Sequence, residues 1–354
     1  MAESKSILFH PDRPCLTPKE HVGREDIISY GYARLATDDI QSFAIIGCQH
    51  EGKTSLLNCI RHSETQSKYF EIKSKLYHFI YMDVSGNCLN SPQEFFSFFY
   101  TCIQKQLNIE RLSNLWNDLP KISEFLEKNS QKLVVVIDDF NFVITNPNFP
   151  VAFYEGLRSW FSTHKNVGCI VTSPIQLLNL TMSLELAGSP FFNIFDSYSI
   201  PPLDEIEAKL LFESRLSENV FHENTDKINK IIEQFGLNPY PLQISGYNLM
   251  SWYSSNQTFT TKELIEKTAI DCNAYYQNIF SSLRDKQIEQ IKLLLRANKA
   301  KDFKLDNVLF DRGLLKEVSS DVIFTSKQLE LFFRDKLNIP VKRSFFSKIF
   351  KRKK

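Results

Sequence analysis

The chain has 354 residues, a formal net charge of +1 and a high phenylalanine content, with 30 residues of that type. This length allows two or three domains with a large buried core. The N-terminal sequence lacks the charged and apolar regions of a signal peptide, and the longest wholly apolar run, residues 133–137, is too short to span a membrane. These features argue against a secreted or membrane-spanning protein.

Seven cysteines are scattered along the chain without a C-x-x-C pair, and their number is odd. Buried thiols in a reducing cytosol are the simplest explanation, so we expect a cytoplasmic protein. The cysteines are Cys15, Cys48, Cys59, Cys88, Cys102, Cys169 and Cys272.

The N-terminal part predicts an irregular lead segment followed by a helix. Residues 1–20 contain three prolines, which block regular helix. An amphipathic helix is then expected to begin after Val22-Gly23 and to end near Leu35. The charged residues at its start are explained by helix formation alone. This segment lies just upstream of residues 43–58, which are described next. Its position favours a second interpretation, in which Val22 and Gly23 pack over the adenine of a nucleotide.

The stretch from residue 43 to 58 is the most informative part of the chain. It contains Gly47, Gly52, Lys53 and Thr54 at the spacing G-x-x-x-x-G-K-[ST], which is the phosphate-binding P-loop. An apolar strand is predicted immediately before it and a helical pattern follows, which is the context that the motif requires. A glycine-bounded turn before an ordinary helix is the alternative.

Each P-loop position has a physical role. The glycines let backbone N–H groups turn toward phosphate oxygens, and the N-terminus of the following helix favours the same anion. Lys53 is expected to neutralise the β- and γ-phosphates, and Thr54 to offer its hydroxyl to Mg²⁺. The predicted nucleotide-binding residues here are Gly47, Cys48, Gln49, His50, Glu51, Gly52, Lys53, Thr54 and Ser55.

A strand predicted over residues 77–83 is followed by a helix that begins near Ser91. Ser91 at the N-cap, Pro92 at the first helical position and Glu94 two residues later form the pattern of a capping box. The helix is rich in phenylalanine, and we expect these side chains to pack against the sheet as ordinary core.

A continuous β-branched run from residue 132 predicts a strand buried on both faces, as in parallel sheets. It ends at Asp138 and Asp139, and ligands bind at the carboxyl ends of strands in open α/β sheets. We expect Asp138 to orient Mg²⁺ through its waters. Asp139 is the candidate base for the attacking water, and it is the predicted catalytic residue together with Lys53. A plain loop start after the strand is the alternative.

Two further strands are predicted, over residues 167–172 and 196–200. The first ends at Thr172 and Ser173, which could sense a γ-phosphate from the neighbouring strand, although Ser and Thr are common at strand ends. Pro201-Pro202 then marks a composition break and a candidate domain boundary.

The pattern is helical from residue 203 onward. Residues 236–242 separate two of these helices, and the glycine and prolines in this segment end helices by themselves. A rigid loop in a lid domain can also touch a nucleotide base, so Pro239 is a candidate base contact.

Residues 281–340 predict two helices, a two-stranded hairpin and a final helix, which together form a winged-helix candidate. Winged helices bind DNA through a recognition helix, but three basic residues near the second helix are matched by three acidic ones. This balance lacks the basic face that DNA binding needs, so we favour protein contact or autoinhibition. The six residues are Lys301, Lys304, Arg312, Asp302, Asp306 and Asp311.

The tail, residues 341–354, interleaves Phe345, Phe346, Ile349 and Phe350 with seven Lys or Arg and contains no acid. A short basic amphipathic helix could lie on an anionic membrane surface, on nucleic acid or on an acidic groove of a partner. A frayed, solubilising tail is the alternative.

Taken together, these stretches resemble a STAND-class P-loop ATPase of the AAA-related, ASCE-type branch, in particular the stand-alone kind common in filamentous cyanobacteria. The resemblance covers about residues 11–335, and the run from residue 146 to 195 is its most distinctive part. The matching pieces are Val22-Gly23-Arg24-Glu25, the P-loop with Thr54-Ser55-Leu56-Leu57, Asp138-Asp139-Phe140, Asn146-Pro147-Asn148-Phe149, Leu157-Arg158-Ser159, residues 189–195, Pro202-Leu203-Asp204 with Glu207-Ala208, and Asn238-Pro239-Tyr240.

The resemblance implies an α/β fold with a five-stranded parallel sheet, a helical lid and a winged-helix domain. The implied divisions are a lead segment (1–20), a P-loop ATPase core (21–201), a lid (202–280), a winged-helix-like domain (281–340) and the basic tail (341–354). ATP with Mg²⁺ is the implied ligand. It is expected to change the domain arrangement or to drive assembly with a protein partner or a second copy, often in signalling or defence.

Two departures from the family pattern bear on turnover. Asp139 stands where many relatives have Glu, which several STAND branches tolerate. Pro174 stands where relatives often carry Arg after Thr-Ser, which predicts slow hydrolysis and suits a switch. The second hypothesis is a DNA-associated AAA-type ATPase, such as an initiator or transposition helper, and the third is a nucleotide-bound scaffold that does not hydrolyse ATP.

Overall fold

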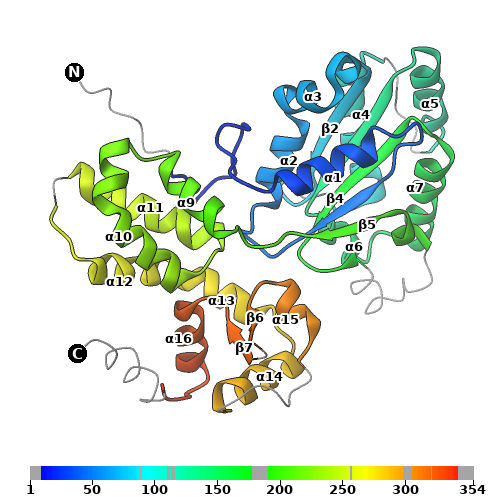
Figure 1. Cartoon of the computed structure of the whole chain (residues 1–354). Coiled ribbons are helices and arrows are strands. Elements are labelled where there is room, and N and C mark those ends of the chain that lie inside the picture. The colour runs from blue at the N-terminus through cyan, green and yellow to red at the C-terminus, as the bar shows by residue number, and fades with distance from the viewer. Residues whose placement is uncertain are drawn as a thin grey trace, which may run out of the picture. The chain divides into compact units, whose positions relative to one another are not determined.

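The structure is a computed structural model of the chain, and it describes residues 9–87, 89–109, 112, 116–177, 190–255, 257–297, 305–319 and 321–341. The basic tail after Val341, Lys301, Asp302, Lys304, Cys88 and Ser189 lie outside the described residues. The chain divides into two compact units. Arg13–Ile200 forms the P-loop unit, and Met1–Asp12 with Pro201–Lys354 forms the C-terminal unit. Figure 1 shows their elements.

The P-loop unit is built on a parallel sheet of five strands in the order β2-β3-β4-β1-β5. All five expected strands are present, and the predicted α/β fold class is confirmed. The register pairs Ile46 with Ser173 and Asp83 with Asp138, so the P-loop and the polar strand ends share one edge of the sheet. The strands are β1 (Phe43–Ile46), β2 (Tyr77–Asp83), β3 (Lys132–Asp138), β4 (Val167–Ser173) and β5 (Asp196–Ser199).

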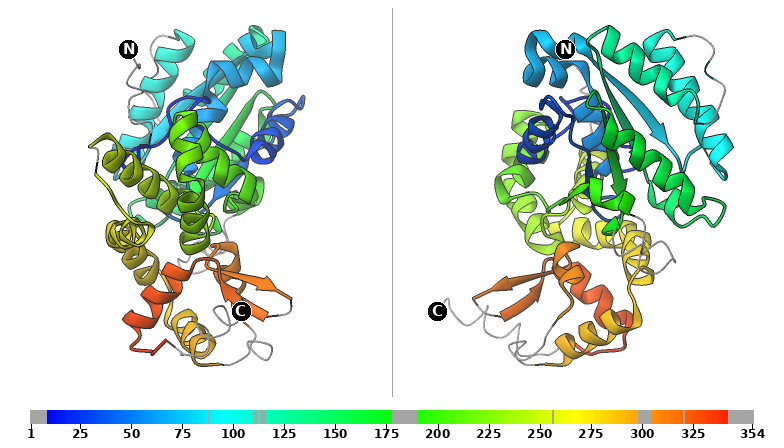
Figure 2. Two further views of the ribbon diagram at one scale, coloured as in Figure 1. Left: turned by 60° about the vertical axis from the view of Figure 1, so that its left-hand side comes forward. Right: turned by 90° about the vertical axis from the view of Figure 1, so that its right-hand side faces the viewer.

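Helices cover both faces of this sheet, as Figures 1 and 2 show. One face packs against α1 (Glu25–Leu35), α2 (Lys53–Arg61) and α3 (Ser63–Phe70), and the other against α4 (Pro92–Leu107), α5 (Leu119–Lys128) and α7 (Val151–Thr163). Val134 and Val136 of β3 face the first layer, whereas Leu133, Val135 and Ile137 face the second. Burial on both faces explains why the run is apolar without alternation. The short elements are η1 (Glu71–Leu76), α6 (Asn141–Ile144) and η2 (Pro190–Ile194).

Helix α4 supplies much of the aromatic core. Phe96 makes edge-to-face contacts with Trp116 and Phe153, with ring centroids 4.6 and 5.9 Å apart. Ser91 caps the helix as expected, because its hydroxyl accepts the Glu94 N–H at 3.2 Å. The Glu94 carboxylate, however, accepts the N–H of Asn90 at 2.7 Å, one residue earlier than the capping-box prediction places it.

The C-terminal unit begins with a group of helices and continues with two helices, a hairpin and a final helix. The hairpin is antiparallel and pairs Leu315 with Phe324. Within the described ranges, no helix combines the length and the apolar character that crossing a membrane requires. The elements are α9 (Glu205–Glu213), α10 (Glu218–Phe235), α11 (Pro239–Ser254), α12 (Thr261–Asp271), α13 (Asn273–Ser281), α14 (Asp285–Arg296), α15 (Asn307–Asp311), β6 (Leu315–Val318), β7 (Asp321–Phe324) and α16 (Lys327–Lys336).

The beginning of the chain belongs to this second unit. Phe9 is only 1% exposed, and its ring centroid lies 5.7 Å from that of Phe212 and 5.9 Å from the guanidinium carbon of Arg215. A Cβ on Gly246 of α11 would lie 2.1 Å from the Phe9 ring, so glycine is what lets the ring approach the helix. The chain therefore passes from the C-terminal unit into the P-loop unit at residue 13 and back again at residue 201.

Candidate functional site

The P-loop connects β1 to α2 through a backbone that only particular residues adopt easily. His50 and Gly52 have φ angles of 65° and 90°, and Gly52 is the N-cap of α2. A Cβ at Gly52 would lie 2.9 Å from Nη1 of Arg24. The left-handed backbone therefore favours glycine at position 52, and a side chain there would displace the Arg24 guanidinium.

Hydrogen bonds hold the loop from two sides. Arg24, which precedes α1, donates from Nη1 to the backbone carbonyl of Glu51 at 2.6 Å. Within the loop, the Cys48 N–H donates to the Glu51 carboxylate at 2.6 Å, and Lys53 Nζ donates to the Cys48 carbonyl at 3.1 Å. The ammonium of Lys53 therefore lies against the loop that would cradle a phosphate.

Asp138 joins the P-loop helix to the strand ends. Its Oδ2 accepts the hydroxyls of Thr54 at 2.7 Å and Tyr81 at 2.9 Å. Its Oδ1 accepts the Thr172 hydroxyl and, at 3.2 Å, the N–H of Asp139. A carboxylate has about four lone-pair positions, so these donors fix its orientation. The carboxylate and the Thr54 hydroxyl are oxygen donors of the kind that Mg²⁺ prefers, and this pair fits a magnesium site.

Asp139 follows in a left-handed conformation, with φ at 55°, which aspartate tolerates better than most residues. Its N–H donates to the Thr172 hydroxyl oxygen at 2.8 Å. The Ser85 hydroxyl lies 3.1 Å from the Asp139 carboxylate and 3.0 Å from that of Asp83. One hydroxyl proton can serve only one of these carboxylates at a time.

The surroundings of Asp139 make its carboxylate more basic than usual. Burial raises the pKa of Asp139, and the negative charge of Asp138 raises it further, while Lys53 opposes both. A carboxylate with a raised pKa is a better proton acceptor near neutral pH. This environment suits the predicted role of a base.

The sequence matches the family described as AAA-like domain over residues 39–334. The chain belongs to this AAA-like domain family. No curated protein matches the sequence.

Solved structures support the fold of this AAA-like protein. The Walker-type ATPase PABY2304 of Pyrococcus abyssi superposes with a TM-score of 0.61 at 13% identity, covering 92% of this chain and 99% of that chain. The Aeropyrum pernix ORC2 protein in ADPNP–ADP complexes gives 0.61 at 13%, covering 95% and 99%. The Aeropyrum pernix ORC1 protein in complex with DNA gives 0.50 at 11%, covering 90% and 94%. At these identities the likeness shows the P-loop NTPase fold alone.

Most of the predicted site residues of this AAA-like protein lie together. The predicted P-loop residues 47–55, Asp138, Asp139, Thr172 and Ser173 all lie at the carboxyl edge of the sheet. The Ser55 hydroxyl accepts the backbone N–H of Cys15 at 3.0 Å, so it faces the N-terminal segment. Pro239 lies in the C-terminal unit at the start of α11, and its contact with a nucleotide base stays a prediction.

The two sensor candidates form local hydrogen bonds. Thr172 bridges the neighbouring strands by donating to Asp138 and accepting from Asp139. The Ser173 hydroxyl donates to the carbonyl of Ile175 at 2.6 Å and closes the turn around Pro174. Sensing of a phosphate by either residue stays a prediction.

Sequence reasoning missed Tyr81 and Ser85 as parts of this AAA-like site. Tyr81 and Asp83 share one face of β2, because side chains two residues apart in a strand point the same way. The polar character of that face near the end of β2 was the available signal. The structural role of Arg24 was also missed, although its motif had been noted.

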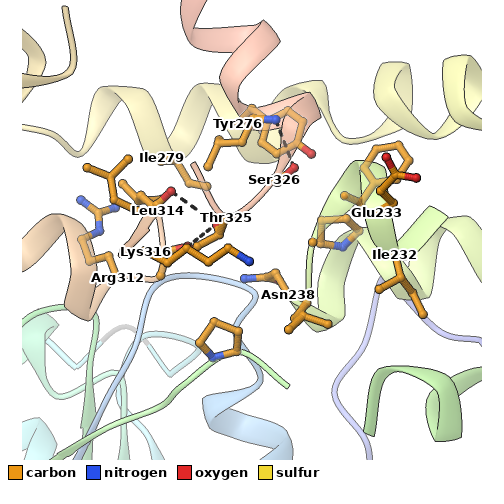
Figure 3. A pocket seen from close by; sticks show the side chains of 18 of the residues that line it. Ile232, Glu233, Asn238, Tyr276, Ile279, Arg312, Leu314, Lys316, Thr325 and Ser326 are labelled. Carbon is orange, nitrogen blue, oxygen red and sulfur yellow. Dashed lines mark hydrogen bonds between the residues drawn. The ribbon is translucent and has the colours of Figure 1, made fainter. Parts of the chain in front are cut away.

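The C-terminal unit of this AAA-like protein contains a cavity of about 590 Å³. Figure 3 shows side chains of α13 and of the β6–β7 region around it. At one corner the Ser326 hydroxyl donates to the Gln234 carbonyl at 3.1 Å, and a Cβ on Gly236 would lie 2.4 Å from the Thr325 carbonyl oxygen. The end of α10 and the start of α16 therefore touch beside the cavity. Its walls include Ile232, Tyr276, Ile279, Leu314, Arg312 and Lys316.

Proposed function

We propose that this AAA-like protein binds ATP with Mg²⁺ at the P-loop, hydrolyses it slowly and acts as a nucleotide-dependent switch. The hydrogen bond of 2.7 Å between Thr54 and Asp138 carries the proposal. It joins the hydroxyl that follows the P-loop lysine to the carboxylate at the end of the third strand, which are the residue types that P-loop ATPases use to hold the metal.

Different residues of the site would bind the phosphates and the metal. The N–H groups at the start of α2 and the ammonium of Lys53 would meet the phosphates. Thr54 and Asp138 would supply the oxygen atoms for Mg²⁺, directly and through water. When bound, the metal would neutralise phosphate charge and orient the phosphates.

Slow turnover follows from the residues around the base. Asp139 would take the proton of the attacking water, and its raised pKa favours this transfer. A hydrogen bond from the Ser85 hydroxyl stabilises the charged form of the same carboxylate and so opposes this transfer. Pro174 offers no cation next to Ser173, where related proteins are expected to carry Arg. Binding and release would then set the lifetime of each state.

The switch itself is the finer part of the proposal. We infer a STAND-type response in which nucleotide changes the arrangement of the units or drives assembly with a partner or a second copy. Signalling or defence in the cytoplasm belongs to the same proposal. It is supported by the family resemblance and by the division of the chain into two units.

A titration with Mg·ATP tests the binding step. Lys53→Ala should weaken binding at least ~10-fold, because a charge-assisted hydrogen bond contributes about 1.5–3 kcal/mol. Lys262→Ala is the matched control, since Lys262 is an exposed lysine of α12. Equal binding by the wild type and the Lys53 variant would refute the proposal. Light scattering with a non-hydrolysable ATP analogue tests the switch, and only the wild type and the control should change in size.

DNA association is the second candidate function. The Aeropyrum pernix ORC1 protein in complex with DNA shares the fold. In the C-terminal unit, α14, α15, the β6–β7 hairpin and α16 follow one another in the order expected of a winged helix. These two observations support the candidate.

A further inference from the structure

Tyr81 of β2 contacts Asp138, one of the two proposed metal-binding residues. Its hydroxyl donates to Oδ2 of Asp138 at 2.9 Å, the same oxygen that accepts the Thr54 hydroxyl. A tyrosine phenol is protonated at neutral pH, so Tyr81 presents a hydrogen-bond donor to this carboxylate.

The strand register shows that Tyr81 approaches from within the sheet. Asp83 pairs with Asp138, whereas Tyr81 pairs with Val136, two residues earlier. At about 3.3 Å per residue, the backbone of Tyr81 lies roughly 6–7 Å below the level of the carboxylate. Ligands of open α/β sheets lie beyond the carboxyl ends of the strands. The backbone of Tyr81 thus lies on the sheet side of the carboxylate, and its hydroxyl reaches Asp138 from there.

A second contact fixes the ring of Tyr81. The guanidinium carbon of Arg61 lies 4.6 Å from its centroid, within cation–π range. Arg61 is held in turn, because its Nε and Nη2 donate to Oδ1 of Asn58 at 3.1 and 3.0 Å. Asn58 donates from Nδ2 to the Cys15 carbonyl at 2.8 Å. These contacts form one connected chain from the N-terminal segment to Asp138.

Both ends of α2 therefore act on the same carboxylate. Thr54 in the first turn contacts Asp138 directly, and Arg61 at the last position reaches it through Tyr81. A carboxylate that binds a metal or its waters must keep one orientation, and its outer hydrogen-bond partners provide this. Without Tyr81, the orientation of the Asp138 carboxylate would depend on Thr54, on Thr172 and on the N–H of Asp139.

We infer that Tyr81, steadied by Arg61, is a positioning residue that holds Asp138 in the orientation needed to bind Mg²⁺. This inference rests on the proposed function and extends it to the metal step. Loss of such an outer partner typically weakens metal affinity about 10–100-fold. Affinity for nucleotide without metal should stay unchanged, because the P-loop and Lys53 do not involve the phenol.

Tyr77 provides a matched control on the same strand and the same face. Its hydroxyl donates to the backbone carbonyl of Leu35 at 3.1 Å, and Lys132 lies 5.5 Å from its ring centroid. Tyr77→Phe thus removes a hydrogen-bonded phenol near a cation, as Tyr81→Phe does, but leaves Asp138 untouched. A purely structural role would make the two variants behave alike.

The test is a Mg²⁺ titration of ATP binding to the full chain, with ATP binding in EDTA measured in parallel. Tyr81→Phe should need ~10-fold or more Mg²⁺ for half-saturation, with unchanged binding in EDTA. Tyr77→Phe should match the wild type. Arg61→Ala keeps the phenol, and it should shift the Mg²⁺ midpoint in the same direction by a smaller factor.

The outcomes separate this inference from the proposed function. A wild type that binds no ATP refutes the proposed function. A wild type with Mg²⁺-dependent binding, together with an unshifted midpoint in Tyr81→Phe, overturns the inference alone. Equal shifts in the Tyr77 and Tyr81 variants also overturn it. If Tyr81→Phe does not fold, an unshifted midpoint in Arg61→Ala overturns the inference and a raised midpoint supports it.

Discussion

Asp139 shows how neighbours shape a single carboxylate. Burial and the charge of Asp138 raise its pKa, whereas Lys53 and the hydrogen bond from Ser85 lower it. Its backbone is left-handed, and its carboxylate lies 3.1 Å from the Ser85 hydroxyl. The sequence predicted a base at this position from the strand end together with the P-loop upstream of it. The Ser85 contact could not be predicted, because it depends on the course of the chain after β2.

The raised pKa of Asp139 predicts opposite pH trends for activity and stability. As pH rises, more Asp139 is deprotonated and able to act as a base, while its contribution to stability decreases. Folded protein keeps the Asp139 proton to higher pH than the unfolded chain does, so this residue costs stability as pH rises through that range. Asp139→Asn should abolish phosphate release and retain ATP binding. The melting temperature of the variant relative to the wild type should increase from about pH 4 to about pH 7. Calorimetry and a phosphate-release assay measure both effects.

Asparagine is a suitable replacement for Asp139 because it also adopts the left-handed conformation readily. Unchanged phosphate release in Asp139→Asn would assign the base to another residue. A melting-temperature difference that shrinks with rising pH would contradict the direction of the pKa change.

Local patterns predicted the elements well, and contacts between distant elements poorly. The β-branched run of β3 and the glycine before α2 determine their own structure, so both were predicted correctly. The hydrogen bond from Tyr81 to Asp138 depends on the pairing of β2 with β3, which no local pattern specifies. Phe9 is similar, because its partners Phe212 and Gly246 lie more than two hundred residues away in the sequence.

Phe9, which packs in the C-terminal unit, gives a prediction at the scale of an element. Phe9→Ala should lower the unfolding free energy of the C-terminal unit by about 3–5 kcal/mol, as expected for a buried phenylalanine. Hydrogen exchange should then speed up in α9 and α11 but not in β1 and β3. Leu16→Ala is the control, since Leu16 is 55% exposed. Equal acceleration in both units, or none, would contradict the placement of Phe9.

Charge gives a prediction at the scale of the whole molecule. In α14, Lys292 pairs with Glu289 at 2.5 Å, and in α16, Arg334 pairs with Glu330 at 2.7 Å. These cations are neutralised on their own helices, whereas residues 342–354 carry seven Lys or Arg and no acid. Any affinity for duplex DNA should therefore be lost when the chain ends at Pro340. Fluorescence anisotropy at increasing salt measures this, because phosphate contacts weaken steeply with salt.

The shortened chain should still bind Mg·ATP, which serves as the control for its folding. Salt-sensitive DNA binding that survives the truncation would assign the interaction to α14–α16 and the β6–β7 hairpin.

The two passages of the chain between the units have a consequence for synthesis on the ribosome. The P-loop unit, Arg13–Ile200, is complete before any helix of the C-terminal unit has been made. Phe9 must wait for Phe212 and Gly246, which at about 5–20 residues per second takes roughly 10–50 s. During that time an apolar side chain that precedes the P-loop unit has no folded partner. The C-terminal unit therefore has to capture residues that were synthesised before the P-loop unit.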